Sequence, residues 1–171
     1  PQVRKKLEGF ENVKIQELDI SGGGIAFAWK MVQINNEYID PSLLKSFLPE
    51  TPSFLFEPDA IISLNILNQL DILIIDFLKT KIQNISESDL SAFRRIIQEF
   101  HIKWITQKPG CLITDVLEEN RSPQGKLTNI DLLHTDLPKS SRSEQWIWDF
   151  DLSGFYHRDR ITKMHVQALE W

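Results

Sequence analysis

The stretch WIWDFDLSGFYHRDR, residues 146–160, decides how the chain is expected to fold. Large apolar residues alternate here with other residues, which is the two-residue period of a strand with one buried face: Trp146, Trp148, Phe150 and Leu152. Ser153-Gly154 interrupts the alternation and is typical of a two-residue turn. The stretch is therefore predicted to form a β-hairpin, whose second strand continues to the chain end through Met164, Val166 and Ala168.

The register set by a Ser153-Gly154 turn predicts partners for most of the charged side chains. On the polar face it places Asp149 opposite Arg158, Asp151 opposite Tyr156, and Ile147 opposite Arg160. Opposite charges that face each other across two strands stabilise a sheet by roughly 0.2–1 kcal/mol. These charges are therefore expected to be structural.

The same register places His157 and Asp159 on the aromatic face of the hairpin, where polar side chains need partners. One interpretation is structural, with each side chain satisfied inside the core. The other is an acid–base site in which Asp159 orients His157. A single His-x-Asp pattern does not separate the two interpretations.

Residues 11–35 are predicted to form an N-terminal β-hairpin. Apolar residues nearly alternate on both sides of a connector that contains Gly22-Gly23-Gly24. A phosphate-binding loop would instead require a helix directly after the glycines, because the helix N-terminal amides hold the phosphate. The residues that follow are β-branched and aromatic, which favours the hairpin.

Two helices are predicted between the hairpins, over residues 59–83 and 86–106. Both show apolar residues at helical spacing, and Ser86 or Ser88 is expected to cap the second. Asp71 falls inside the apolar arc of the first, where a carboxylate must find a partner or stay protonated. It is a third candidate functional residue, although pairing with a Lys or Arg would also explain it. In residues 111–144 the sequence pattern does not distinguish a strand from a helix.

The predicted fold class is α+β, as one domain over residues 1–171. An antiparallel sheet from the N- and C-terminal β-hairpins is expected to pack against a central antiparallel helix pair. The first residue is Pro1 rather than Met, so we expect a domain cut from a longer protein or a processed chain.

Composition excludes some functions and disfavours others. The net charge of −5 argues against general nucleic-acid binding, which needs a basic surface. No run of about 20 apolar residues predicts a membrane span. The single cysteine, Cys111, cannot form an internal disulfide, so a cytoplasmic protein is expected. No metal-binding or cofactor-binding motif is recognised, so neither is predicted.

The functional prediction is a non-enzymatic protein-interaction or regulatory module, which binds another protein or associates with itself. Interfaces are enriched in Trp, Tyr and Arg, and the last hairpin supplies candidate binding residues: Trp146, Trp148, Tyr156, Arg158 and Arg160. The alternative is a small-ligand-binding or acid–base enzyme domain built around His157 and Asp159. Whether the protein is an enzyme stays open at this point.

Overall fold

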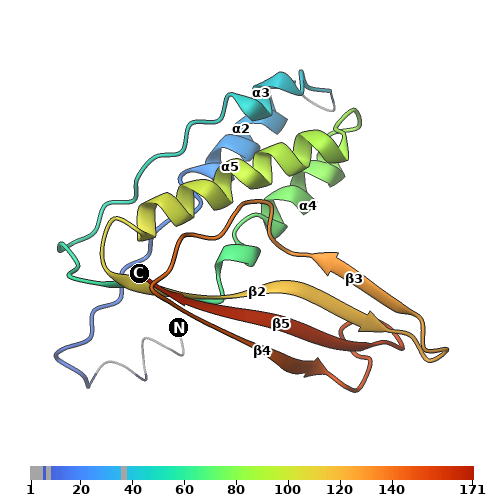
Figure 1. The fold of residues 1–171 in the computed structure, drawn as a ribbon. Helices are drawn as coiled ribbons and strands as arrows, with labels where there is room; N and C mark the ends of the chain where they lie inside the picture. Colours follow the sequence, from blue (N-terminus) through green and yellow to red (C-terminus); the bar gives the residue numbers. More distant parts are fainter. Residues whose placement is uncertain (1–5, 7–8, 36–37) are drawn as a thin grey trace.

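The computed structural model describes residue 6 and residues 9–35 and 38–171, and this part of the chain has an α+β fold (Figure 1). The helices are α2 (Gly24–Asn35), α3 (Ser42–Lys45), α4 (Ile72–Lys81) and α5 (Glu87–Ile105), with a short 3₁₀ helix η1 (Leu67–Gln69). The strands are β1 (Ile61–Leu64), β2 (Gly110–Arg121), β3 (Leu127–Asp131), β4 (Arg142–Asp151) and β5 (Ile161–Glu170).

The five strands form one mixed sheet with the order β1-β2-β5-β4, and β3 pairs with the second half of β2. β1 and β2 are parallel, whereas β5 is antiparallel to both β2 and β4. The prediction of an α+β protein is thus confirmed, but the prediction of a purely antiparallel sheet is wrong. A parallel pair needs a long crossover, and the chain between β1 and β2 supplies it with α4 and α5.

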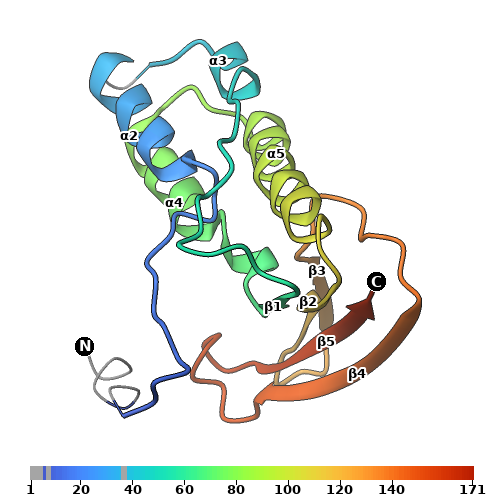
Figure 2. The ribbon, with the colours of Figure 1, turned by 90° about the vertical axis from the view of Figure 1, so that its left-hand side faces the viewer.

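The helices lie together on one side of the sheet (Figure 2). Their shared core is formed by buried apolar side chains from all four helices, such as Ala28, Leu44, Ile75 and Phe93. A second core joins the end of α5 to the sheet, where Ile102 and Ile105 gather with Leu112 of β2. The helices are therefore attached to the sheet mainly through α5.

The predicted second helix is confirmed as α5. Ser86 caps it, because the Ser86 hydroxyl accepts from the Asp89 backbone N–H at 3.2 Å and the Asp89 carboxylate accepts from the Ser86 N–H. Such a reciprocal capping box satisfies two amides that the first helical turn leaves free.

The predicted first helix is only partly right. α4 covers its second half, but residues 61–64 form strand β1 and residues 67–69 form η1. The β-branched pair Ile61-Ile62 suits a strand, and no glycine or proline marks its junction with the helix that follows.

The predicted N-terminal hairpin is wrong, because residues 24–35 form helix α2 and residues 11–20 belong to none of the assigned strands. The side chains that α2 buries, Ala28 and Met31, are three apart, and Gly24 lies one turn before Ala28. Gly24 allows close packing, since a Cβ there would lie 3.2 Å from Ile97 Cδ1 and 3.3 Å from Ile74 Cδ1. Tertiary packing thus overrides the alternating pattern.

The C-terminal strands do pair antiparallel, but the predicted turn and register are wrong. Residues 152–160 form a loop between β4 and β5, and Asp149 faces Lys163 rather than Arg158. The Asp151 carboxylate shapes this loop by accepting from Ser153 N at 2.8 Å and Tyr156 N at 2.6 Å. These hydrogen bonds lower the pKa of Asp151 to about 2, with that from the Ser153 side chain contributing most. The predicted pair of Asp149 with Arg158 therefore does not form, and Ile147 lies opposite His165 rather than Arg160.

Candidate functional site

The two faces of the sheet differ in what covers them. Ser63 and Leu112 point toward α5, since the Ser63 hydroxyl lies 2.9 Å from His101 Nε2 and Leu112 belongs to the core around Ile105. Because side chains alternate along a strand, Ile62, Leu64 and Ile113 point to the opposite face. Ile113 pairs with Ala168 of β5, so Val166 and Met164 point to this same face. They pair in turn with Trp146 and Trp148 of β4.

We call this second surface the aromatic face, defined by Trp146, Trp148, Phe150 and Tyr156. Three ring contacts run along it in series. The ring centroids are 5.1 Å apart for Trp148 and Phe150, 4.9 Å for Phe150 and Tyr156, and 4.5 Å for Tyr156 and His157. All three pairs have the edge-to-face geometry that aromatic rings favour. The 152–160 loop thus folds back over the end of the same face.

A polar cluster lies beneath the loop. His157 Nε2 lies 2.7 Å from Glu118 Oε1, and Glu118 also accepts from Asn120 Nδ2 at 2.6 Å. Thr162 on β5 donates its hydroxyl to Asn120 Oδ1 at 2.7 Å. Glu118, Asn120 and Thr162 are buried, so the cluster joins the loop to β2 and β5.

The aromatic side chains themselves remain accessible. Trp146 is 43% exposed and Trp148 is 46% exposed, although Val166 and Met164 beside them are buried. The apolar surface reappears at the far edge of the sheet, where Ile62 on β1 is 74% exposed. Burial still raises the pKa of Tyr156, with further contributions from Glu118 and Asp115, so its hydroxyl stays protonated at neutral pH. The aromatic face therefore exposes large rings and one hydroxyl, that of Tyr156, to a binding partner.

The structure separates the two residues of the predicted acid–base pair. His157 bonds to Glu118, whereas Asp159 is exposed, has a φ of 60°, and lines a hollow of about 420 Å³ between loop tips. No hydrogen bond joins Asp159 to His157 among the described residues. Arg158 and Arg160 are exposed on the same loop, and neither forms an ion pair within the described part of the chain.

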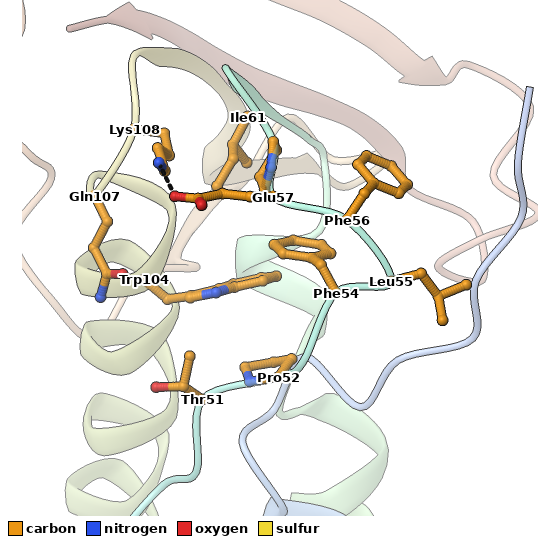
Figure 3. A pocket seen from close by; sticks show the side chains of 11 residues that line it. Thr51, Pro52, Phe54, Leu55, Phe56, Glu57, Ile61, Trp104, Gln107 and Lys108 are labelled. Carbon is orange, nitrogen blue, oxygen red and sulfur yellow. Dashed lines mark hydrogen bonds and ion pairs between the residues drawn. The ribbon is translucent and has the colours of Figure 1, made fainter. Parts of the chain in front are cut away.

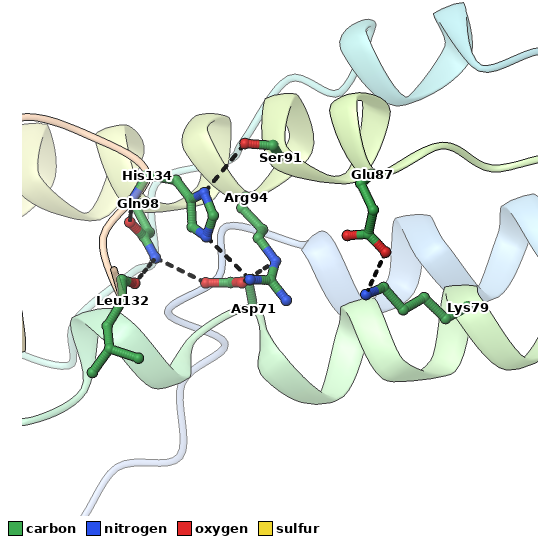
Figure 4. Close-up of polar contacts among 8 residues, drawn as sticks. All are labelled: Asp71, Lys79, Glu87, Ser91, Arg94, Gln98, Leu132 and His134. Atoms are coloured by element: carbon green, nitrogen blue, oxygen red, sulfur yellow. Dashed lines mark hydrogen bonds and ion pairs between the residues drawn. The ribbon is translucent and has the colours of Figure 1, made fainter. Parts of the chain in front are cut away.

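Asp71 has the structural partners that its position in the apolar arc required (Figure 4). Arg94 Nε lies 3.1 Å from Asp71 Oδ2, and Gln98 Nε2 donates to Asp71 Oδ1 at 3.0 Å. Burial raises the pKa of Asp71, while Gln98 and Arg94 oppose the rise. Gln98 also accepts from the His134 backbone N–H, and Arg94 lies 3.0 Å from His134 Nε2. The network therefore fastens the 132–141 connector to α5.

A separate hollow of about 480 Å³ lies beside the end of α5 (Figure 3). Phe54 stacks on Trp104 along its wall, with ring centroids 5.3 Å apart, and Lys108 forms an ion pair with Glu57 at 2.5 Å. None of the residues predicted from the sequence as candidate site residues lines it.

The glycine-rich turn has a feature that the sequence interpretation missed. Gly22 and Gly23 have φ values of 67° and 89°, and helix α2 begins at the next residue. Two asparagines lie beyond the carboxyl end of strand β1: Asn65 follows the strand directly, and Asn68 lies in η1. Their side-chain oxygens are buried and have no hydrogen-bond partner among the described residues. The backbone amides at the N-terminus of a helix attract anions and hydrogen-bond acceptors.

The described residues contain no group of three or more His, Cys, Asp or Glu side chains that could hold a metal ion. None of their helices combines the length and apolar character needed to cross a bilayer.

No protein-family model matches the chain, and comparison with curated proteins and with solved structures finds no significant match.

Proposed function

We propose that the protein is an interaction module that binds another protein through the aromatic face. The single observation that supports this is the exposure of Trp146 and Trp148 on a sheet face that no helix of the described chain covers. Tryptophan and tyrosine contribute disproportionately to protein interfaces when they become buried.

The geometry of the face supports a preformed binding surface. The Trp148, Phe150 and Tyr156 rings hold one another in edge-to-face contact, and the Asp151 hydrogen bonds fix the loop that carries Tyr156. Side chains that are already ordered lose less conformational entropy on binding. Arg158 and Arg160 lie on the same loop, where their free guanidinium groups favour a partner with acidic residues at the rim of its contact surface.

The proposal is tested by quantitative co-purification from cells that produce the protein natively. The variants are Trp148→Asp and, as a matched control, Leu73→Asp on α4, where the leucine is 81% exposed. We expect a stoichiometric partner with the wild type and the control, and its loss with Trp148→Asp at unchanged thermal stability. Purified partner should then bind Trp148→Asp at least about tenfold more weakly. A partner that binds Trp148→Asp and wild type equally would contradict the proposal.

A second candidate function is the binding of a small ligand beside the glycine-rich turn. The observation that favours it is the pair of buried, unpartnered oxygens of Asn65 and Asn68 at the end of β1. Gly24 packs against Ile74 in the first turn of α4, which follows η1 directly, so the glycine turn and the asparagines belong to neighbouring segments.

The chemistry of this position favours a ligand with both donors and acceptors. The asparagine oxygens need N–H or O–H donors, whereas helix N-terminal amides attract acceptors and anions. A nucleoside that carries a charged group combines the two. We expect ATP, NAD or S-adenosylmethionine to shift the amide NMR signals of residues 22–25 and to raise the midpoint of thermal unfolding. The absence of shifts with all three at saturating concentrations would contradict the candidate.

A further inference from the structure

The outer edge of β4 is free. The strand order ends at β4, which pairs only with β5. In an antiparallel pair, alternate residues turn their backbone N–H and C=O groups away from the neighbouring strand. No other segment of the described chain bonds to these outward groups on β4. An edge of this kind can pair with a strand from another chain.

β4 carries few of the features that usually protect such an edge. Proteins commonly place charged side chains, proline or a bulge there. Residues 142–151 contain no proline or lysine, and their charged residues lie toward the two ends of the strand: Arg142, Glu144, Asp149 and Asp151. The bulge lies at the far end of the strand, between Asp149 and Asp151. The centre of the strand, residues 145–148, is uncharged, and Ile147 is 57% exposed on the face opposite the aromatic rings.

We propose that a second copy of this chain pairs antiparallel with β4 along this edge, so that the two five-stranded sheets become continuous. Two identical strands that pair antiparallel are related by a two-fold axis perpendicular to the sheet. The interface is therefore self-complementary and closes after two copies. The perpendicular axis also keeps each face of the sheet on its own side.

The side chains favour one register. Residues that lie directly opposite each other must point to the same face. With Ile147 on the axis, Ile147 faces the partner's Ile147, and Trp146 faces the partner's Trp148. Both contacts join apolar side chains that are exposed in one copy. Glu144 then faces the partner's Phe150, and no like charges lie opposite each other. Registers centred on Glu144 or Asp149 would oppose two carboxylates, which is destabilising.

This inference goes beyond the proposed function, because it needs no other protein. In the dimer the two aromatic faces lie on the same side and form one surface across the axis. A partner with two equivalent contact sites would then bind more tightly than a partner with one.

The test is sedimentation equilibrium of the full 171-residue chain, with Ile147→Lys as the variant and Leu73→Lys as the control. We expect the wild type and the control to sediment with twice the mass of one chain, and Ile147→Lys to dimerise at least about tenfold more weakly. Ile147 lies on the face opposite the rings, so this substitution leaves the aromatic face intact.

A second variant keeps the proposal testable if Ile147→Lys fails to fold. Ile147→Cys should form a disulfide-linked dimer under mild oxidation, because directly opposed Cβ atoms in an antiparallel pair lie about 4.5–5.5 Å apart. Leu73→Cys also contains the native Cys111 and should not form a disulfide-linked dimer. The proposal is overturned if the wild-type dissociation constant is weaker than about 1 mM, or if neither Ile147 variant differs from its control. Loss of the dimer would leave partner binding by the aromatic face intact, so the two proposals fail separately.

Discussion

Acidification should destabilise the protein through His101. This side chain is buried in α5, with Nε2 2.9 Å from the Ser63 hydroxyl of β1. Burial lowers its pKa from 6.5 to about 4, and the Ile20 backbone opposes the change only in part. The folded protein therefore holds a neutral imidazole at a pH where the unfolded chain carries an imidazolium.

The expected magnitude follows from this difference in pKa. Between about pH 6.5 and about pH 4 the unfolded state binds more protons than the folded state, so the free energy of unfolding falls as the pH falls. At about 1.36 kcal/mol per pH unit, the full loss is about 3 kcal/mol, of which about 2 kcal/mol is reached by about pH 5. A domain of this size has a stability of roughly 5–15 kcal/mol, so the loss is measurable.

The assay is urea unfolding, followed by circular dichroism, of the wild type and of His101→Gln at about pH 7 and about pH 5. Gln keeps a hydrogen-bonding group toward Ser63 but does not titrate. We expect the wild type to lose about 2 kcal/mol more than the variant between these two conditions. Equal losses in the two proteins would refute the assignment of His101 as a buried neutral histidine.

Two further substitutions test the packing around the site. Arg94→Ala should destabilise the protein by about 3 kcal/mol, because it leaves the Asp71 carboxylate buried beside one amide donor; a loss below about 1 kcal/mol in urea unfolding would contradict the network. Gly22→Ala should cost more than Gly23→Ala in thermal unfolding. Both glycines have positive φ, but a Cβ at Gly22 would lie 2.7 Å from Phe100 and Pro49, whereas nothing lies within 4 Å of one at Gly23. The conformational cost shared by both is about 1–2 kcal/mol, and equal stabilities would show that residue 22 is not enclosed.

The segments that the sequence predicts well are those whose local signals agree with their packing. α5 has a cap at Ser86 and apolar residues at helical spacing, and the structure confirms it. β4 has a strict alternation that places Trp146 and Trp148 on one face, as in the structure. In both cases propensity, periodicity and termini favour the same element.

The segments that the sequence predicts wrongly are those with ambiguous periodicity. In residues 24–35 the apolar residues fit both a strand and a helix, and only contacts with Ile74 and Ile97 around Gly24 favour the helix. Residues 61–81 read as one helix because a short strand and α4 follow each other without a breaker. Alternation alone cannot distinguish these cases.

The candidate site also has a part that the sequence predicts and a part that it does not. The aromatic residues can be found from the sequence, but the partner of His157 cannot. Glu118 lies 39 positions away in sequence, on a strand whose register shifts between Asp115 and Leu117. A bulge of this kind changes which side chains share a face, so the alternation within residues 111–121 does not reveal Glu118 as a neighbour of the loop.

The most direct test of the central claim is site-specific photo-cross-linking in cells that produce the protein natively. A photoreactive amino acid replaces Trp148 in one variant and Leu73 in the other. If the aromatic face binds another protein, position 148 should give a discrete adduct with one protein other than a second copy of this chain. Unmodified protein should compete with this adduct, and position 73 should not give it. The same low, heterogeneous yield at both positions would contradict the claim that the aromatic face is an interaction surface.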